Sequence, residues 1–133
     1  MASELRVNTL KDASGNNSVA LSTVAEGSAK AWAHIAAGGA SLPDSFNFSS
    51  IDDDGTGEYG LNYTSAMNST NYSATAVISY NHTSGVNNLR NLVIEGKTTS
   101  SVEVDGGYAN TDAYFVSYDI ELNASVAIHG DLA

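Results

Sequence analysis

Short stretches in which apolar and polar residues alternate recur along this chain, and turn-forming residues separate them at intervals of roughly ten residues. These stretches occupy residues 29–35, 44–51, 59–63, 72–80, 89–95, 101–104, 113–118 and 122–129. No segment keeps a helical period over roughly ten or more residues. We therefore expect about seven to nine short strands, a number typical of an all-β sandwich or barrel.

The alternation also predicts which side chains share a face of a strand. In residues 29–35, Trp32 and His34 share one face, opposite the small and aliphatic residues between them. In residues 44–51, we expect Phe46 and Phe48 to share a face.

Residues 1–28 differ in character from the rest of the chain, because their few apolar residues are too sparse to form a core alone. We expect an extended N-terminal arm that docks on another surface; a first edge strand of the domain is the alternative. The Ala-rich residues 18–37 invite a helix assignment, but Gly27 and the β-type residues argue against it. The predicted organisation is an arm at 1–28 and an antiparallel, jelly-roll-like β-sandwich domain at 29–133.

The chain is strongly acidic, with 15 acidic and 5 basic residues and a net charge of −10. Nucleic-acid binding depends mainly on neutralising phosphates with Lys and Arg. The basic residues are scattered and form no basic cluster in the sequence: Arg6, Lys11, Lys30, Arg90 and Lys97. We therefore exclude nucleic acid as the main partner, and an anionic membrane surface is disfavoured for the same reason.

The chain contains no cysteine, which excludes a disulfide framework and thiolate chemistry. The first residues lack the apolar core of a secretory signal, and no apolar run approaches the roughly 18 residues of a membrane span. We expect synthesis in a cytoplasm.

The sharpest local motif is Asp52-Asp-Asp-Gly-Thr-Gly-Glu58, and we predict that its residues 52–57 form the turn of a hairpin. Asp52, Asp54 and Thr56 stand where an EF-hand loop has its first three oxygen ligands. Tyr63 occupies the twelfth position, where that loop needs a bidentate Glu. A solvated acidic turn is the favoured interpretation. The three residues form a weak calcium candidate, and we expect no other metal or cofactor.

No other pattern predicts a catalytic centre, and we expect no enzyme activity. The histidines His34, His82 and His129 lack the short spacing of a metal-binding pair. The sequence has neither a Gly-x-Ser-x-Gly elbow nor a phosphate-binding Gly loop followed by Lys. Carboxylate pairs for glycoside hydrolysis are conceivable at Glu95 with Glu103 and at Asp119 with Glu121, but nothing in the sequence marks either pair as buried.

Aromatic residues allow two interpretations. They either fill the core or a seam between subunits, which we favour, or form platforms for sugar rings. The residues concerned are Trp32, Tyr59, Tyr63, Tyr72, Tyr80, Tyr108, Tyr114 and Tyr118.

Two segments carry a family resemblance: Ser28-Ala-Lys-Ala-Trp32 and Asp44-Ser-Phe-Asn-Phe-Ser-Ser-Ile-Asp-Asp-Asp-Gly-Thr-Gly-Glu-Tyr59. They resemble a module of tail-fibre and related virion proteins of tailed phages, many of them marine. Further similarities lie at residues 4–15, 59–63, 66–73 and 126–131. The chain departs from the family at Leu42-Pro43, where the family often has an Arg, and it lacks a long fibre shaft.

The resemblance implies a structural virion protein, expected to form a homotrimer. It would be a surface subunit of the particle, either a head decoration or fibre protein or a short tail-fibre component. Its partners would be other capsid or tail proteins, which its N-terminal arm would contact. The alternative is a tail-fibre tip that recognises a glycan of the host surface.

Overall fold

The computed structural model describes residues 6–39, 41–79, 90–109, 114–119 and 123–133, and most of these residues lie in strands. In chain order the elements are β1 (Thr9–Lys11), β2 (Ser18–Ala20), α1 (Leu21–Gly27), β3 (Ala31–Ile35), the 3-10 turn η1 (Ala37–Gly39), β4 (Asp44–Phe46), β5 (Phe48–Gly55), β6 (Glu58–Tyr63), β7 (Ser73–Ile78), β8 (Arg90–Lys97), β9 (Ser101–Ala109), β10 (Phe115–Ser117) and β11 (Ala124–His129). Neither described helix has the length and apolar content that crossing a bilayer requires.

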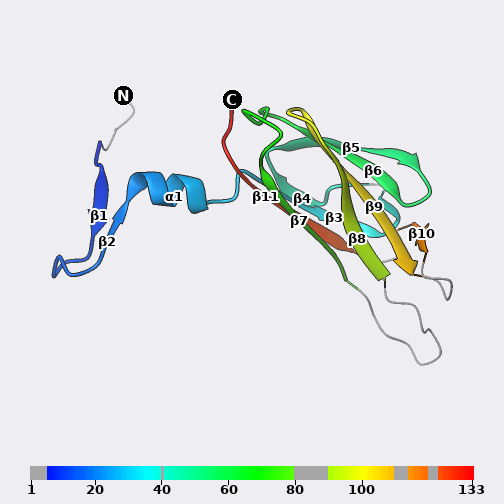
Figure 1. The fold of residues 1–133 in the computed structure, drawn as a ribbon, viewed down its shortest axis with the longest axis horizontal. Coiled ribbons are helices and arrows are strands. Elements are labelled where there is room, and N and C mark those ends of the chain that lie inside the picture. Colours follow the sequence, from blue (N-terminus) through cyan, green and yellow to red (C-terminus); the bar gives the residue numbers. More distant parts are fainter. Residues whose placement is uncertain (1–5, 40, 80–89, 110–113, 120–122) are drawn as a thin grey trace.

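Two antiparallel sheets form the body of the protein (Figure 1). Sheet I has the strand order β4-β3-β11-β7. In sheet II, β5 pairs with β6 and β6 with β9. β9 also pairs with β8 along its other edge, and its C-terminal end pairs with β10. β7 and β8 lie side by side, so the two sheets meet along these strands. The predicted all-β antiparallel sandwich is confirmed.

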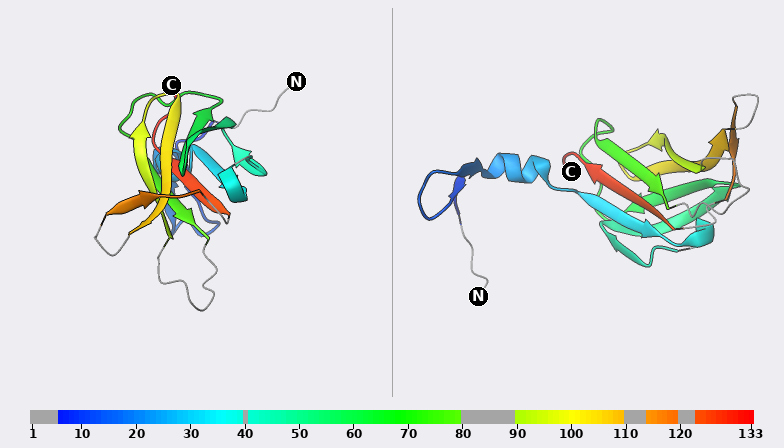
Figure 2. Two further views of the ribbon diagram at one scale, coloured as in Figure 1. Left: turned by 90° about the vertical axis from the view of Figure 1, so that its right-hand side faces the viewer. Right: turned by 90° about the horizontal axis from the view of Figure 1, so that it is seen from below.

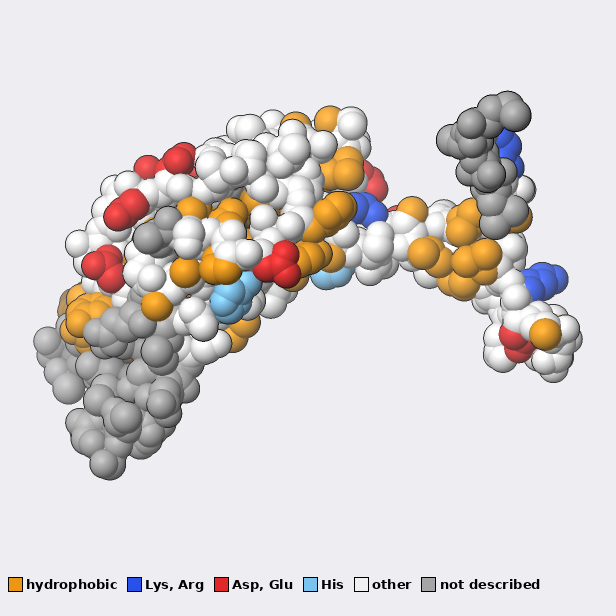
Figure 3. Space-filling view, turned by 180° about the vertical axis from the view of Figure 1, so that it is seen from behind, with side chains coloured by type: hydrophobic (Ala, Val, Ile, Leu, Met, Phe, Trp, Pro, Cys, Tyr) orange, Lys and Arg blue, Asp and Glu red, His pale blue; other side chains and the backbone are white. Residues whose placement is uncertain are grey.

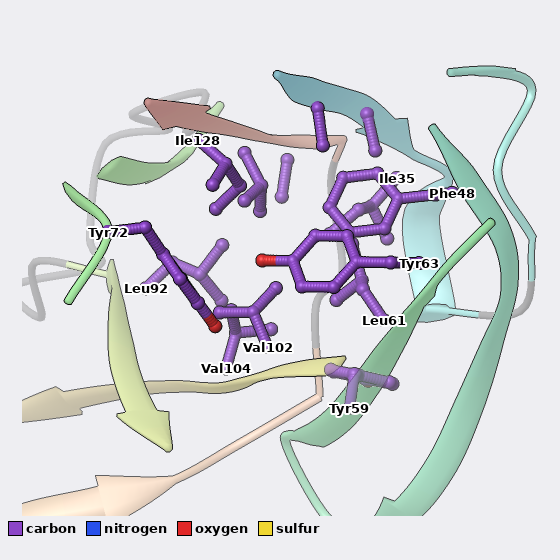
Figure 4. Packing of buried hydrophobic residues seen from close by; sticks show 14 of the residues in the cluster. Ile35, Phe48, Tyr59, Leu61, Tyr63, Tyr72, Leu92, Val102, Val104 and Ile128 are labelled. Atoms are coloured by element: carbon purple, nitrogen blue, oxygen red, sulfur yellow. The ribbon is translucent and has the colours of Figure 1, made fainter. Parts of the chain in front are cut away.

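The core lies between the sheets (Figure 4), and in β3 and β11 its buried residues alternate with less buried ones, as expected. Sheet I contributes mainly small and aliphatic side chains, from Ala31, Ala33, Ile35, Ala124, Val126 and Ile128. Sheet II contributes larger ones, from Phe48, Tyr59, Leu61, Tyr63, Leu92, Val102 and Val104. Phe48 stacks on Tyr63 with ring centroids 5.0 Å apart. Pairing small residues with large ones lets the two sheets pack without voids.

The predicted strand at residues 44–51 is divided in two, because the chain changes sheets at Asn47. Asn47 has a φ of 59°, in the left-handed region, and its side chain bonds the backbone of Ser65 at both the N–H (2.7 Å) and the carbonyl (3.1 Å). As a result Phe46 faces outward from sheet I and is 51% exposed, while Phe48 is buried in the core. The prediction that these rings share a face is therefore wrong.

Residues 6–28 form a short β1–β2 hairpin and the helix α1, and they extend from the sandwich in both Figures 1 and 2. The prediction against a helix within residues 18–37 is wrong for Leu21–Gly27. Nothing in α1 is buried, and its N-terminus has no side-chain cap. Short isolated helices are marginal in water, and the sandwich buries no side chain of this one.

Candidate functional site

The calcium candidate does not form a loop. Asp52 and Asp54 lie within strand β5, and only Thr56 lies in the turn that joins β5 to β6. Asp52 accepts a hydrogen bond of 2.6 Å from the Asn62 side chain on the neighbouring strand. The predicted turn at residues 52–57 is therefore shorter than expected. Across the described part of the chain, no three His, Asp or Glu side chains gather in a metal-binding cluster.

The outward face of sheet II is acidic. Glu103 lies opposite Gly60, and Glu58 opposite Asp105, on the face away from the buried Tyr59 and Val104. A carboxylate oxygen of Glu103 and one of Asp54 each lie 3.0 Å from the position that a Cβ on Gly60 would take. Glu103 also accepts a hydrogen bond of 2.9 Å from the Ser101 hydroxyl. Carboxylates on the edge strand β5 discourage pairing with the edge of another sheet.

Among the described residues, the others that the sequence suggested for catalysis or metal binding lie on or beside several different strands. Glu95 is exposed on β8, Asp119 follows β10, and Asp119 accepts a hydrogen bond of 2.9 Å from the Gly57 N–H. His34 and His129 lie on β3 and β11. Tyr80, His82 and Glu121 lie outside the described residues. Of the suggested carboxylate pairs, Glu95 lies at the bulge of β8 next to Gly96, which pairs with Glu103 on β9, and Asp119 is bonded to the turn at Gly57.

The aromatic residues divide into a buried and an exposed group. Tyr59, Tyr63 and Tyr72 are buried, as the favoured interpretation predicts for core residues. The Tyr72 hydroxyl donates a hydrogen bond of 3.0 Å to the Ser101 carbonyl, and the ring lies 6.0 Å from that of Tyr63 in an edge-to-face arrangement. Burial raises the pKa of both the Tyr63 and the Tyr72 phenol above the usual value.

The exposed aromatic residues of β10 and its surroundings gather at the end of the sandwich away from residues 6–28 (Figure 1). Tyr114 is 70% exposed and Phe115 43% exposed. Tyr108 and Tyr118 contact each other edge to face, with ring centroids 6.1 Å apart. We call Tyr108, Tyr114, Phe115 and Tyr118 the aromatic end. Sequence reasoning named the tyrosines, but only the fold shows which of them share a surface.

The turn between β5 and β6 holds the aromatic end in place. The Gly57 carbonyl accepts a hydrogen bond of 2.8 Å from the Gly106 N–H, and the Tyr118 N–H donates one of 2.7 Å to the Gly106 carbonyl. Gly57 has a φ of 80°, and a Cβ there would lie 2.4 Å from the Gly106 carbonyl oxygen and 2.8 Å from the Tyr118 nitrogen. Only glycine fits this close approach of three backbone segments.

Gly57→Ala is therefore expected to loosen the aromatic end and to lower the free energy of unfolding by about 2 to 3 kcal/mol, more than a positive φ alone would cost. Amide hydrogen exchange should accelerate at Tyr118 and along β10, because the hydrogen bonds around Gly57 must open. Gly15→Ala is the matched control, since Gly15 also has a positive φ of 72° but has no atom within 4 Å of its Cβ position. Unchanged exchange at Tyr118 in Gly57→Ala would contradict this account.

No protein-family model, curated protein or solved structure matches this chain.

Proposed function

We propose that this chain is a structural surface subunit of a tailed-phage particle, either a head decoration or fibre protein or a short tail-fibre component. It would act as a homotrimer and dock on other virion proteins through residues 1–28. One observation supports it most: residues 6–28 have regular structure but bury almost none of their apolar side chains. Leu10 is 44% and Val24 43% exposed, and no residue of α1 is buried. An ordered segment with uncovered apolar side chains is suited to bind another surface.

The separation of the sandwich from the extended residues 6–28 also supports this role. The sandwich supplies a rigid body, and the segment that we propose to dock extends from one end of it (Figure 2). The aromatic end then points away from the docked segment. The proposed role needs no catalytic group and no cofactor.

Particles of the phage that encodes the chain provide the test. We expect mass spectrometry of purified virions to detect the protein. The double variant Leu10→Asp/Val24→Asp should be lost from the particles, because the charges would have to be buried where the apolar side chains dock. Thr64→Asp/Asn68→Asp is the matched control, since it adds the same charge at two exposed loop positions of the sandwich.

Two outcomes would defeat the proposal. One is the absence of the wild-type protein from mature virions. The other is normal incorporation of Leu10→Asp/Val24→Asp, which would show that this segment is not the docking surface. Circular dichroism of each purified variant verifies that the sandwich is folded.

The aromatic end supports a second candidate function, recognition of a host-surface glycan. Tyr114 and Phe115 are exposed, and aromatic rings pack against the C–H faces of sugars. We expect Tyr114→Ala/Phe115→Ala to abolish binding to a glycan array and to host cells if this function is correct. A wild-type protein that gives no signal in either assay would remove this candidate.

A further inference from the structure

The outward face of sheet I is nearly free of charge. Cross-strand pairing places its side chains in two rows that run across all four strands. One row is Phe46, Trp32, Ala127 and Thr75, and the other is Asp44, His34, Ser125 and Val77. We call these eight residues the Trp32 face. Asp44 is the one carboxylate among them, and it lies on the edge strand β4.

Large apolar side chains of the Trp32 face are open to water. Trp32 is 39%, Phe46 51% and Val77 59% exposed. Ala127 and Ser125 are small, so a groove of about 400 Å³ runs over β11 between the taller side chains of β3 and β7. Figure 3 shows this side of the molecule, with hydrophobic side chains over the middle of the sandwich and further ones on residues 6–28. Exposed apolar surface of this kind marks an interaction site.

The charge distribution indicates what can cover this face. The outward face of sheet II carries Asp52, Asp54, Glu58, Glu103 and Asp105, while the Trp32 face carries Asp44 alone. Two copies of a chain with a net charge of −10 repel each other. They can approach at least electrostatic cost through their neutral faces, with the acidic faces directed into water. Interface cores are depleted of charged residues and enriched in aromatic ones, as this face is.

We propose that a second copy of this chain covers the Trp32 face, and that an exposed aromatic side chain of one copy enters the groove over Ala127 and Ser125 of the other. The inference rests on the proposed function in one respect, that the subunit acts as a homo-oligomer, and it names the surface through which the copies meet. Trp and other large aromatic residues are the usual centres of binding energy at such interfaces.

The chain offers a direct probe, because Trp32 is its single tryptophan. We expect the emission of Trp32 to shift to shorter wavelength as the full-length protein is concentrated, since association removes the indole from water. Light scattering after size exclusion should give a mass that is a multiple of the 13.8 kDa chain. Added salt should tighten association, because it screens repulsion between the acidic copies.

Val77→Asp provides the decisive variant, because it adds a charge at the most exposed large apolar side chain of the face and leaves Trp32 as the probe. We expect its association to weaken at least tenfold, with a monomer mass and an emission maximum that no longer depends on concentration. Phe46→Ser, which adds no charge, is a second variant with the same expected direction. Thr64→Asp is the control and should associate as the wild type does, because Thr64 lies outside the Trp32 face.

A wild-type protein that remains monomeric on concentration would overturn the inference. So would an oligomer that Val77→Asp and Phe46→Ser leave unchanged, which would place the contact elsewhere, for example on residues 6–28. A shift of Trp32 emission in the monomer on adding neutral oligosaccharide would assign the face to a sugar instead. Particle incorporation is measured separately, so an oligomer that forms through this face but is absent from virions would defeat the proposed function alone.

Discussion

Gly39→Ala is expected to lower the free energy of unfolding by about 3 to 5 kcal/mol, a large share of the stability of a small domain. Gly39 has a φ of 66°, which L-residues adopt at a cost. A Cβ at this position would lie 1.9 Å from Cε1 of Tyr59. Tyr59 is only 1% exposed and is held in the core, so its ring has little room to move away.

Gly38→Ala separates the cost of the positive φ from the cost of crowding against Tyr59. Gly38 precedes Gly39 in η1 and has a φ of 82°, but no atom lies within 4 Å of its Cβ position. Gly38→Ala should therefore lower the free energy of unfolding only by the cost of the positive φ, about 1 to 2 kcal/mol. Urea denaturation followed by circular dichroism measures both variants. Equal losses in the two variants would show that crowding against Tyr59 contributes nothing.

The sandwich could be predicted from the sequence wherever a strand is buried on one face. In β3, Ala31, Ala33 and Ile35 are all buried, as their alternation with Trp32 and His34 predicts. A period of two residues is a direct consequence of strand geometry, so it can be recognised without knowing the neighbouring strands. The same holds for β11, although the sequence does not reveal that β11 lies between β3 and β7.

The errors arose where a distant contact decides the local structure. Asn47 interrupts an alternating pattern that looks continuous, because bonds to the backbone of Ser65 hold it in the left-handed conformation. Residues 52–54 form part of a strand although Asp disfavours strands, because β5 pairs with β6 and exposes these carboxylates. Such contacts lie outside any local window of the sequence.

The candidate surfaces were harder to predict than the fold. The sequence pattern placed Trp32 and His34 on one face of a strand, but it also placed Phe46 on the same face as Phe48, which is buried. The change of sheet at Asn47 brings Phe46 opposite Trp32 and so completes an exposed aromatic pair. The aromatic end likewise depends on the pairing of β10 with the end of β9, which no periodicity indicates.

Alkaline conditions are expected to unfold the protein through Tyr63 and Tyr72. Burial raises the pKa of both phenols in the folded protein, whereas the unfolded chain titrates near the ordinary value of about 10. Above that pH the unfolded chain binds fewer protons than the folded one, so stability falls as the pH rises. Each phenol steepens this fall by at most about 1.4 kcal/mol per pH unit, and only between its unfolded and its folded pKa. Below about pH 9 neither phenol makes stability depend on pH.

Phenylalanine variants test this account residue by residue. Tyr63→Phe should reduce the loss of stability between pH 10 and 12, measured by urea denaturation at each pH. It should also leave neutral-pH stability nearly unchanged, because the buried Tyr63 hydroxyl makes no hydrogen bond of ordinary geometry in the described part of the chain.

Tyr72→Phe should reduce the alkaline slope as well, but it should cost about 1 kcal/mol at neutral pH, because it removes the hydrogen bond to the Ser101 carbonyl. The two substitutions therefore act in the same direction at high pH and differ in their effect at neutral pH. An alkaline slope that neither variant changes would assign the loss of stability to other groups that titrate above pH 9, the lysines and the remaining tyrosines, since those groups are present in all three proteins.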